Sequence, residues 1–253
     1  MRFSRDVGRG RYGRIASVPK RLGYLIVLVI LGVGAAYLYR TLRPAGLRGA
    51  LVFAWLRDPA ADPGLVIPAG SRCGAAPFLF PTSGVPGFLW DDSFQPGHRH
   101  QGVDIFAGTN VNVTEVIAVY YGFVTRLPEW KSSLILRIPD DPLQPGRQIW
   151  VYYTHMADPQ GHSFIAADFP PGTYDKPVQA GAFLGRQGDY SGDPNNPVGV
   201  HLHISVVKDR AGKFLNELDI DNTYDPSPYF GLPLNGRQNP DRIPSCGQGA
   251  GAE

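Results

Sequence analysis

Short apolar runs separated by turn residues dominate the chain from residue 73 onward. Runs rich in β-branched and aromatic residues occupy residues 103–106, 116–124, 134–138, 149–154, 183–185 and 202–207. Such runs are typical of strands, and none alternates with an amphipathic helix as a βαβ unit would require. We therefore expect an all-β domain, an antiparallel sheet or sandwich, over residues 73–235.

Two long segments interrupt this pattern at residues 139–146 and 157–176, and both are rich in proline and glycine. Long loops on a β scaffold often form the walls of a binding groove, so both are candidates for groove walls. After Gly236 the chain turns polar and rich in glycine. We expect a flexible C-terminal tail over residues 236–253.

The N-terminal part has a different pattern, with an uncharged apolar run at residues 22–39. This length is near the lower limit for a membrane-spanning helix. Residues 1–21 carry seven basic residues and one acid, which predicts a cytoplasmic N-terminus and an extracytoplasmic domain on a single-pass membrane protein. A cleaved signal peptide is the alternative, because Gly34, Ala35 and Ala36 are small enough for a cleavage site.

Between the apolar run and the domain, residues 40–72 are expected to form a juxtamembrane linker. Four prolines interrupt this segment, and its apolar patch at residues 51–56 is too short to span a bilayer. Trp55, within the patch, is a residue type enriched at membrane interfaces.

Composition changes this picture in two ways. The net charge of +2 conceals a basic tail on a mildly acidic body, so the domain lacks the basic face that nucleic-acid binding requires. The only two cysteines, Cys73 and Cys246, lie near the two ends of the domain. They are either a disulfide, as an exported chain allows, or two unrelated buried thiols.

Two compact groups of residues can bind a metal. In a strand, residues i and i+2 face the same side, so His201 and His203 point into one groove while Leu202 and Ile204 face the core. His100 and Asp104 lie four residues apart at the entry to the strand at 103–106, with Gly102 between them. Two histidines and one carboxylate leave one position of a tetrahedral Zn²⁺ open, as in a catalytic site.

A further histidine, His155, ends the aromatic run Tyr152-Tyr153-Thr154. With H-x-x-x-D at 100–104 and H-x-H at 201–203, this set resembles the lysostaphin-type, or LytM-like, zinc endopeptidases in the order of its motifs. Segments 116–124, 178–185 and 224–226 are also similar to that family, and the resemblance covers roughly residues 80–230. The chain departs from it at 109–113, after His155 and at 188–199, which affects groove shape and substrate.

The resemblance implies that His100, Asp104 and His203 bind one Zn²⁺ per chain. His155 and His201 would do the acid and base work on the bound water or stabilise the oxyanion, and which histidine does which stays open. His98 is a rival ligand, but its spacing from Asp104 does not fit the motif. His162, in the 157–176 loop, is expected to be solvated.

The implied activity is hydrolysis of peptide bonds in peptidoglycan stem peptides or cross-bridges. Two alternatives stay open: a non-catalytic wall-binding or regulatory module, and a peptidase that acts on an exported protein substrate.

Overall fold

The computed structural model describes residues 24, 26–34, 46–93 and 98–246. The chain divides into two units, Met1–Leu42 and Arg43–Glu253, which are considered separately. In the first unit, Tyr24 and residues 26–34 are helical. The remainder of the predicted span at 22–39, like the basic tail, lies outside the described residues. Over the part of the chain that is described, no helix combines the length and the apolar character needed to cross a membrane.

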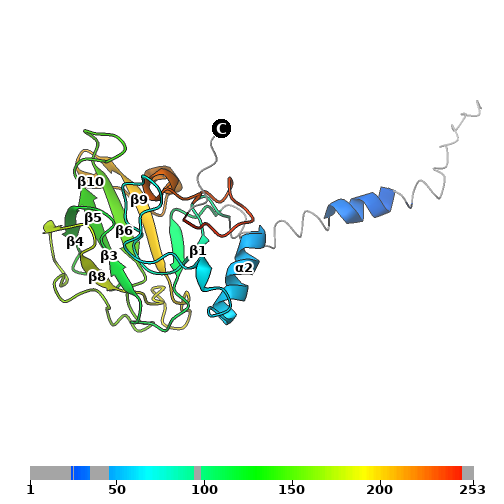
Figure 1. Ribbon diagram of the computed structural model, residues 1–253, viewed down its shortest axis with the longest axis horizontal. Helices are drawn as coiled ribbons and strands as arrows, with labels where there is room; N and C mark the ends of the chain where they lie inside the picture. The colour runs from blue at the N-terminus through cyan, green and yellow to red at the C-terminus, as the bar shows by residue number, and fades with distance from the viewer. Residues whose placement is uncertain (1–23, 25, 35–45, 94–97, 247–253) are drawn as a thin grey trace, which may run out of the picture. The chain divides into compact units, whose positions relative to one another are not determined.

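The second unit is mostly antiparallel β-sheet, which confirms the predicted fold class of its domain (Figure 1). Its nine-stranded sheet has the path β1-β2-β9-β6-β5-β4-β7, with β10 and β11 both paired to β9, and β3 pairs β8 in a separate two-stranded sheet. The elements are α2 (Gly46–Arg57), η1 (Pro63–Leu65), β1 (Val85–Phe88), β2 (Val103–Phe106), β3 (Glu115–Ile117), β4 (Gly122–Thr125), β5 (Leu134–Ile138), β6 (Ile149–Thr154), β7 (Lys176–Val178), β8 (Phe183–Arg186), β9 (Leu202–Arg210), β10 (Lys213–Phe214), η2 (Ile220–Asn222), β11 (Thr223–Tyr224) and α3 (Ser227–Phe230).

The main core lies on one face of the large sheet and follows the period-two alternation of the strands. Val103 and Ile105 of β2 and Leu202 and Ile204 of β9 belong to this core. Residues between them in sequence, including Asp104 and His203, therefore face the other side. The opposite face of the sheet carries the candidate site.

The apolar run at 116–124 does not form one strand. β3 pairs with β8, whereas β4 pairs with β5 and β7 in the large sheet, so the chain changes sheet between Ile117 and Gly122. Gly122 allows a close approach, because a Cβ there would overlap the carbonyl of Arg137.

The segment predicted to be a linker contains helix α2, which packs against β1 beside the sheet (Figure 1). Val52 and Trp55 of α2 are buried in a second core cluster with Val85 and Phe106. Burial removes these two side chains of the patch at 51–56 from water, whereas others, Phe53 among them, stay exposed.

The tail predicted to be flexible from residue 236 is anchored over its described part. Asn239 and Ile243 are buried, and Cys246 forms a disulfide with Cys73. The covalent bond and the burial of Ile243 hold a segment whose composition alone favours disorder. Residues 247–253 lie outside the described residues.

Candidate metal centre

Asp104 and His203 face each other on neighbouring strands. They are direct cross-strand partners in the antiparallel pairing of β2 and β9. Nδ1 of His203 lies 2.8 Å from Oδ1 of Asp104. Cross-strand partners have Cβ atoms about 5 Å apart, so the sheet itself brings these two side chains within reach of one ion.

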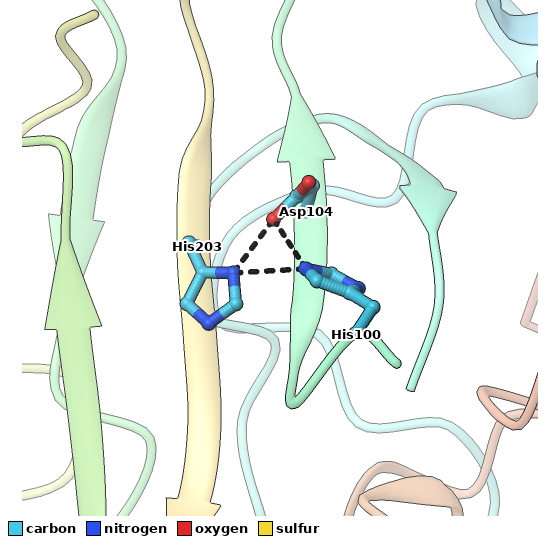
Figure 2. A group of neighbouring side chains, drawn as sticks. All are labelled: His100, Asp104 and His203. Carbon is cyan, nitrogen blue, oxygen red and sulfur yellow. Dashed lines mark hydrogen bonds and ion pairs between the residues drawn. The ribbon is translucent and has the colours of Figure 1, made fainter. Parts of the chain in front are cut away.

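His100 reaches the same point from the loop that precedes β2. Its Nε2 lies 3.1 Å from both Oδ1 of Asp104 and Nδ1 of His203, so that three side chains converge (Figure 2). Gly102 makes this approach possible, because a Cβ there would lie closer than 3.0 Å to the carbonyl oxygen of Ile204, Oγ of Ser205 and Nε2 of His203. The close approach to β9, and not a left-handed backbone, is why glycine is needed.

The three converging atoms form a donor set that suits a metal ion. His100, Asp104 and His203 can place one ligand atom each within 4.8 Å of one another. In tetrahedral zinc, bonds of about 2.0–2.2 Å separate ligand atoms by about 3.3–3.5 Å. The observed separations of 2.8–3.1 Å are slightly shorter, so a small expansion of the triangle accommodates the ion.

Hydrogen bonds behind the rings determine which nitrogens face the site. Nδ1 of His100 lies 2.9 Å from the carbonyl oxygen of Leu89, which can only accept, so Nδ1 carries the proton and Nε2 of the neutral ring presents a lone pair. Nε2 of His203 lies 2.9 Å from Oγ of Ser205, which leaves Nδ1 for the site. Lone pairs that face one another require a proton or a cation between them, and metal-binding histidines typically have such partners.

Charge is concentrated on Asp104. Burial alone would raise the pKa of this carboxyl, but the neighbouring His100 and His201 and the hydrogen bonds from His100 and His203 hold it well below its usual range. Burial lowers the pKa of His203, and Asp104 opposes this only in part. For His100, burial lowers the pKa and Asp104 raises it, with a net rise. The site therefore holds a carboxylate anion against imidazole rings, an environment that favours a cation.

His155 and His201 lie beside the three converging residues. Their ring centroids are 4.5 Å apart, and Nε2 of His201 is 3.6 Å from Oδ1 of Asp104. Nδ1 of His155 donates to the carbonyl oxygen of Tyr190 at 2.7 Å, and Nδ1 of His201 to that of Gly199 at 2.9 Å. Each neutral ring therefore keeps a lone pair on Nε2.

Both of these histidines favour the neutral form. Burial lowers the pKa of His201 to about 4, and burial together with the neighbouring His203 lowers the pKa of His155. Neutral imidazoles can accept a proton from water at neutral pH.

The five residues open into a groove of about 760 Å³. Its lining includes aromatic, apolar and hydroxyl side chains from distant parts of the chain: Phe53, Phe88, Phe106, His98, Gln101, Ser132, Ser133, Tyr152, Thr154, Tyr190, Ser191, Gly192, Asn196, Pro197, Val198, Glu217 and Leu218, in addition to the five site residues. Within the described residues, neither the 139–146 loop nor the 157–176 loop contributes to the lining. The segment 190–198 does so instead, where the sequence departs from the family pattern.

Three tyrosines and two further histidines of the domain have different surroundings. Tyr190 lines the groove, whereas Tyr120 packs against the main core and Tyr121 against Phe123. His98 is half-buried in the groove lining and does not belong to the three-residue donor set. The side chain of His162 is 79% exposed and pairs with Asp158, as expected for a solvated residue.

The groups that hold the rings were not predicted from the sequence. Ser205 could have been found, because it follows His203 by two residues and shares its face of β9. The carbonyls of Leu89, Gly199 and Tyr190 belong to the backbone, so the residue types at these positions do not reveal them. Phe53 belongs to a segment expected to be a linker.

The chain is similar to solved structures of other proteins. A Ruminococcus gnavus protein described as a candidate glycyl-glycine endopeptidase, LytM, is 24% identical, with a TM-score of 0.34. The match covers 51% of this chain and 45% of that chain, so it spans about half of each. No protein-family model and no curated protein matches the chain. The chain resembles the LytM-like endopeptidases in its motifs.

Proposed function

We propose that the protein is a zinc-dependent endopeptidase that hydrolyses peptide bonds in peptidoglycan stem peptides or cross-bridges. The observation that carries the proposal is the convergence of His100, Asp104 and His203 beside two further histidines in an open groove. The intact donor set argues against the non-catalytic binding module, which would not need it. In this proposal the three residues hold one Zn²⁺, and His155 and His201 are catalytic.

When bound, zinc would act as a Lewis acid and lower the pKa of a water molecule toward about 7. His155 and His201 hold their Nδ1 protons on backbone carbonyls, so Nε2 of each is free to accept a proton from the attacking water. The protonated ring can then donate that proton to the leaving amine. An imidazolium in this position also stabilises negative charge on the carbonyl oxygen.

The groove floor suits a peptide backbone. Oγ of Ser133 lies 3.0 Å from the hydroxyl of Tyr152 and 2.7 Å from Oγ1 of Thr154. These hydroxyls can both donate to peptide carbonyls and accept from peptide N–H groups. An extended peptide laid along β6 would therefore find hydrogen-bond partners beside the metal centre.

We also propose that residues 22–39 anchor the protein in the cell membrane as a single pass. Residues 1–21 would lie in the cytoplasm, and the β domain would face the wall. The basic tail and the apolar run support this topology, and the disulfide between Cys73 and Cys246 is typical of an exported domain.

The test is elemental analysis of the full chain, purified in detergent, beside its Asp104→Ala and His203→Ala variants. We expect about one zinc per wild-type chain and none in either variant, because each variant loses one of the three ligands. A wild-type chain that binds no zinc after incubation with the metal would reject the proposal and favour the non-catalytic module.

His155→Ala separates catalysis from metal binding. This variant should keep its zinc and lose about 10²–10⁴-fold in the rate of peptide cleavage, the range for removal of a general acid or base. Rates on purified peptidoglycan and on an unfolded polypeptide distinguish wall peptide from protein as the substrate. Normal cleavage by this variant would remove His155 from the mechanism.

A further inference from the structure

Helix α2 places a buried arginine in the domain. Arg48 is 0% exposed, and its Nη2 donates to both oxygens of Asp92 at 2.5 Å. Its Nε donates to the carbonyl oxygen of Gly87 at 2.9 Å, and Nη1 donates to that of Asn239. A buried guanidinium with partners on all three nitrogens holds three separate chain segments in one arrangement.

Asp92 connects this arginine to His100. Oδ2 of Asp92 accepts from the backbone N–H of Leu89 at 2.6 Å, and the N–H of Asp92 donates to the carbonyl oxygen of Leu89 at 3.1 Å. The N–H of His100 donates to the carbonyl oxygen of Asp92 at 2.8 Å. Segment 89–92 is therefore bonded to the ion pair on one side and to the backbone of His100 on the other.

The same segment orients the ring of His100. The carbonyl of Leu89 accepts from Nδ1, which turns Nε2 toward Asp104 and His203. A displacement of this carbonyl would rotate the ring away from the two other donors. Because the acceptor is a backbone atom, its position depends on the side chains that hold segment 89–92. The carboxylate of Asp92 bonds the N–H of Leu89 itself, whereas the side chains of Trp90 and Asp91 bond groups elsewhere.

We propose that Arg48 is a positioning residue for the metal centre, acting through Asp92 and the Leu89 carbonyl on His100. This inference rests on the proposed function, since it concerns the same metal ligand. With this role for Arg48, part of the segment that was expected to be a linker supports the metal centre. Partners behind metal-binding histidines typically change metal affinity or activity about 10- to 100-fold when they are mutated.

The experiment measures zinc affinity of the full chain in detergent. Wild type, Arg48→Met and Arg48→Met/Asp92→Asn are stripped of metal and titrated with zinc against a chromogenic chelator. The double variant is included because Arg48→Met alone leaves a buried carboxylate without its cation, which can prevent folding. Circular dichroism establishes which variants are folded.

We expect the dissociation constant for zinc to rise about tenfold in the folded variants, at the lower end of the range for such partners. Cobalt(II) in place of zinc gives a second readout, because its visible absorption reports ligand geometry. We expect this spectrum to change in the Arg48 variants and to stay constant in a control variant, Arg147→Met. Neither measurement depends on peptide cleavage.

Arg147→Met is the matched control. Arg147 pairs with Asp141, whose side chain is 0% exposed, at the hairpin that joins β5 to β6, whereas the site lies at the other end of β6. This variant also removes the cationic partner of a buried carboxylate, and we expect it to keep the zinc affinity of the wild type.

Three outcomes would overturn the inference, and they are distinguishable. Unchanged zinc affinity and cobalt spectrum in a folded Arg48 variant would show that His100 does not depend on Arg48, with the proposed function intact. An equal loss of affinity in Arg147→Met would assign the effect to general destabilisation. A wild-type chain that binds neither metal would reject the proposed function together with the inference.

Discussion

At the scale of single residues, the ring nitrogens that face away from the centre are as informative as those that face it. Each of the four site histidines has a partner on its second nitrogen: Leu89, Tyr190, Gly199 or Ser205. Three of these partners are backbone carbonyls, and the fourth is a side chain that can be changed. Ser205 therefore offers the direct test of how much such a partner contributes.

Ser205→Ala should raise the dissociation constant for zinc about 10-fold or more, because Nε2 of His203 loses its partner and the ring is less firmly oriented. Competition with a chelator measures it. Ser227→Ala is the control, since Oγ of Ser227 accepts a hydrogen bond from the N–H of Leu234 away from the site. Equal affinities for wild type and Ser205→Ala would show that the strand alone orients His203.

His155 adopts a backbone conformation that residues other than glycine seldom use. Its φ is 70°, directly after the end of β6. Such a conformation costs about 1–3 kcal/mol and is concentrated at functional sites. The hydrogen bond from Nδ1 to Tyr190 helps to hold it, which links His155 to the segment 190–198 that lines the groove.

At the scale of elements, helix α2 has two faces with different roles. Arg48, Val52 and Trp55 are buried against the domain, whereas the Phe53 side chain is 47% exposed and lines the groove. Its ring packs edge-on against Phe88 of β1, with centroids 6.0 Å apart. Through Phe53, the helix thus contributes to the lining of the groove.

Phe53→Ala should raise KM for the peptide substrate severalfold and leave kcat nearly unchanged, because this side chain has no role in the proposed chemical step and contributes only to binding. Steady-state kinetics on a defined peptide measures both. Leu51→Ala is the control on the same helix, since Leu51 is exposed and does not line the groove. A fall in kcat with KM constant would contradict this role.

At the scale of the whole molecule, the disulfide closes the β domain. Cys73 and Cys246 are 173 residues apart in sequence, and their Cα atoms are 5.0 Å apart. The closed loop includes every strand of both sheets. Of the two alternatives that the sequence left open, the structure therefore has the paired cysteines.

Cys73→Ser/Cys246→Ser should lower the free energy of unfolding by about 2–5 kcal/mol, because the unfolded chain regains the freedom that the closed loop removes. Denaturant titration of the full chain, with and without a reducing agent, measures the loss. Reduction should destabilise the wild type by a similar amount and leave the double variant unaffected. A wild type that is insensitive to reduction despite loss of the disulfide would refute the expectation.

Local sequence pattern was enough to predict several of the strands and the faces of those strands that carry chemistry. β2, β5 and β6 have the predicted bounds, and the alternation in β9 places His201 and His203 on the face opposite Leu202 and Ile204. These features were predictable because the two-residue period of a strand is a local property of the backbone. The motif residues His100, Asp104 and His203 were selected by the same local spacing together with the family resemblance.

Which groups from distant parts of the chain surround those residues was not predictable from local sequence pattern. The pairing of Asp104 with His203, the ion pair from Arg48 to Asp92 and the place of Phe53 in the groove all join segments at least 35 residues apart. Local patterns of hydrophobicity say nothing about such contacts, because they arise when sheet register and the burial of α2 bring the segments together. For the same reason, a stretch that is rich in proline and looks like a linker becomes part of the wall and the support of the candidate site.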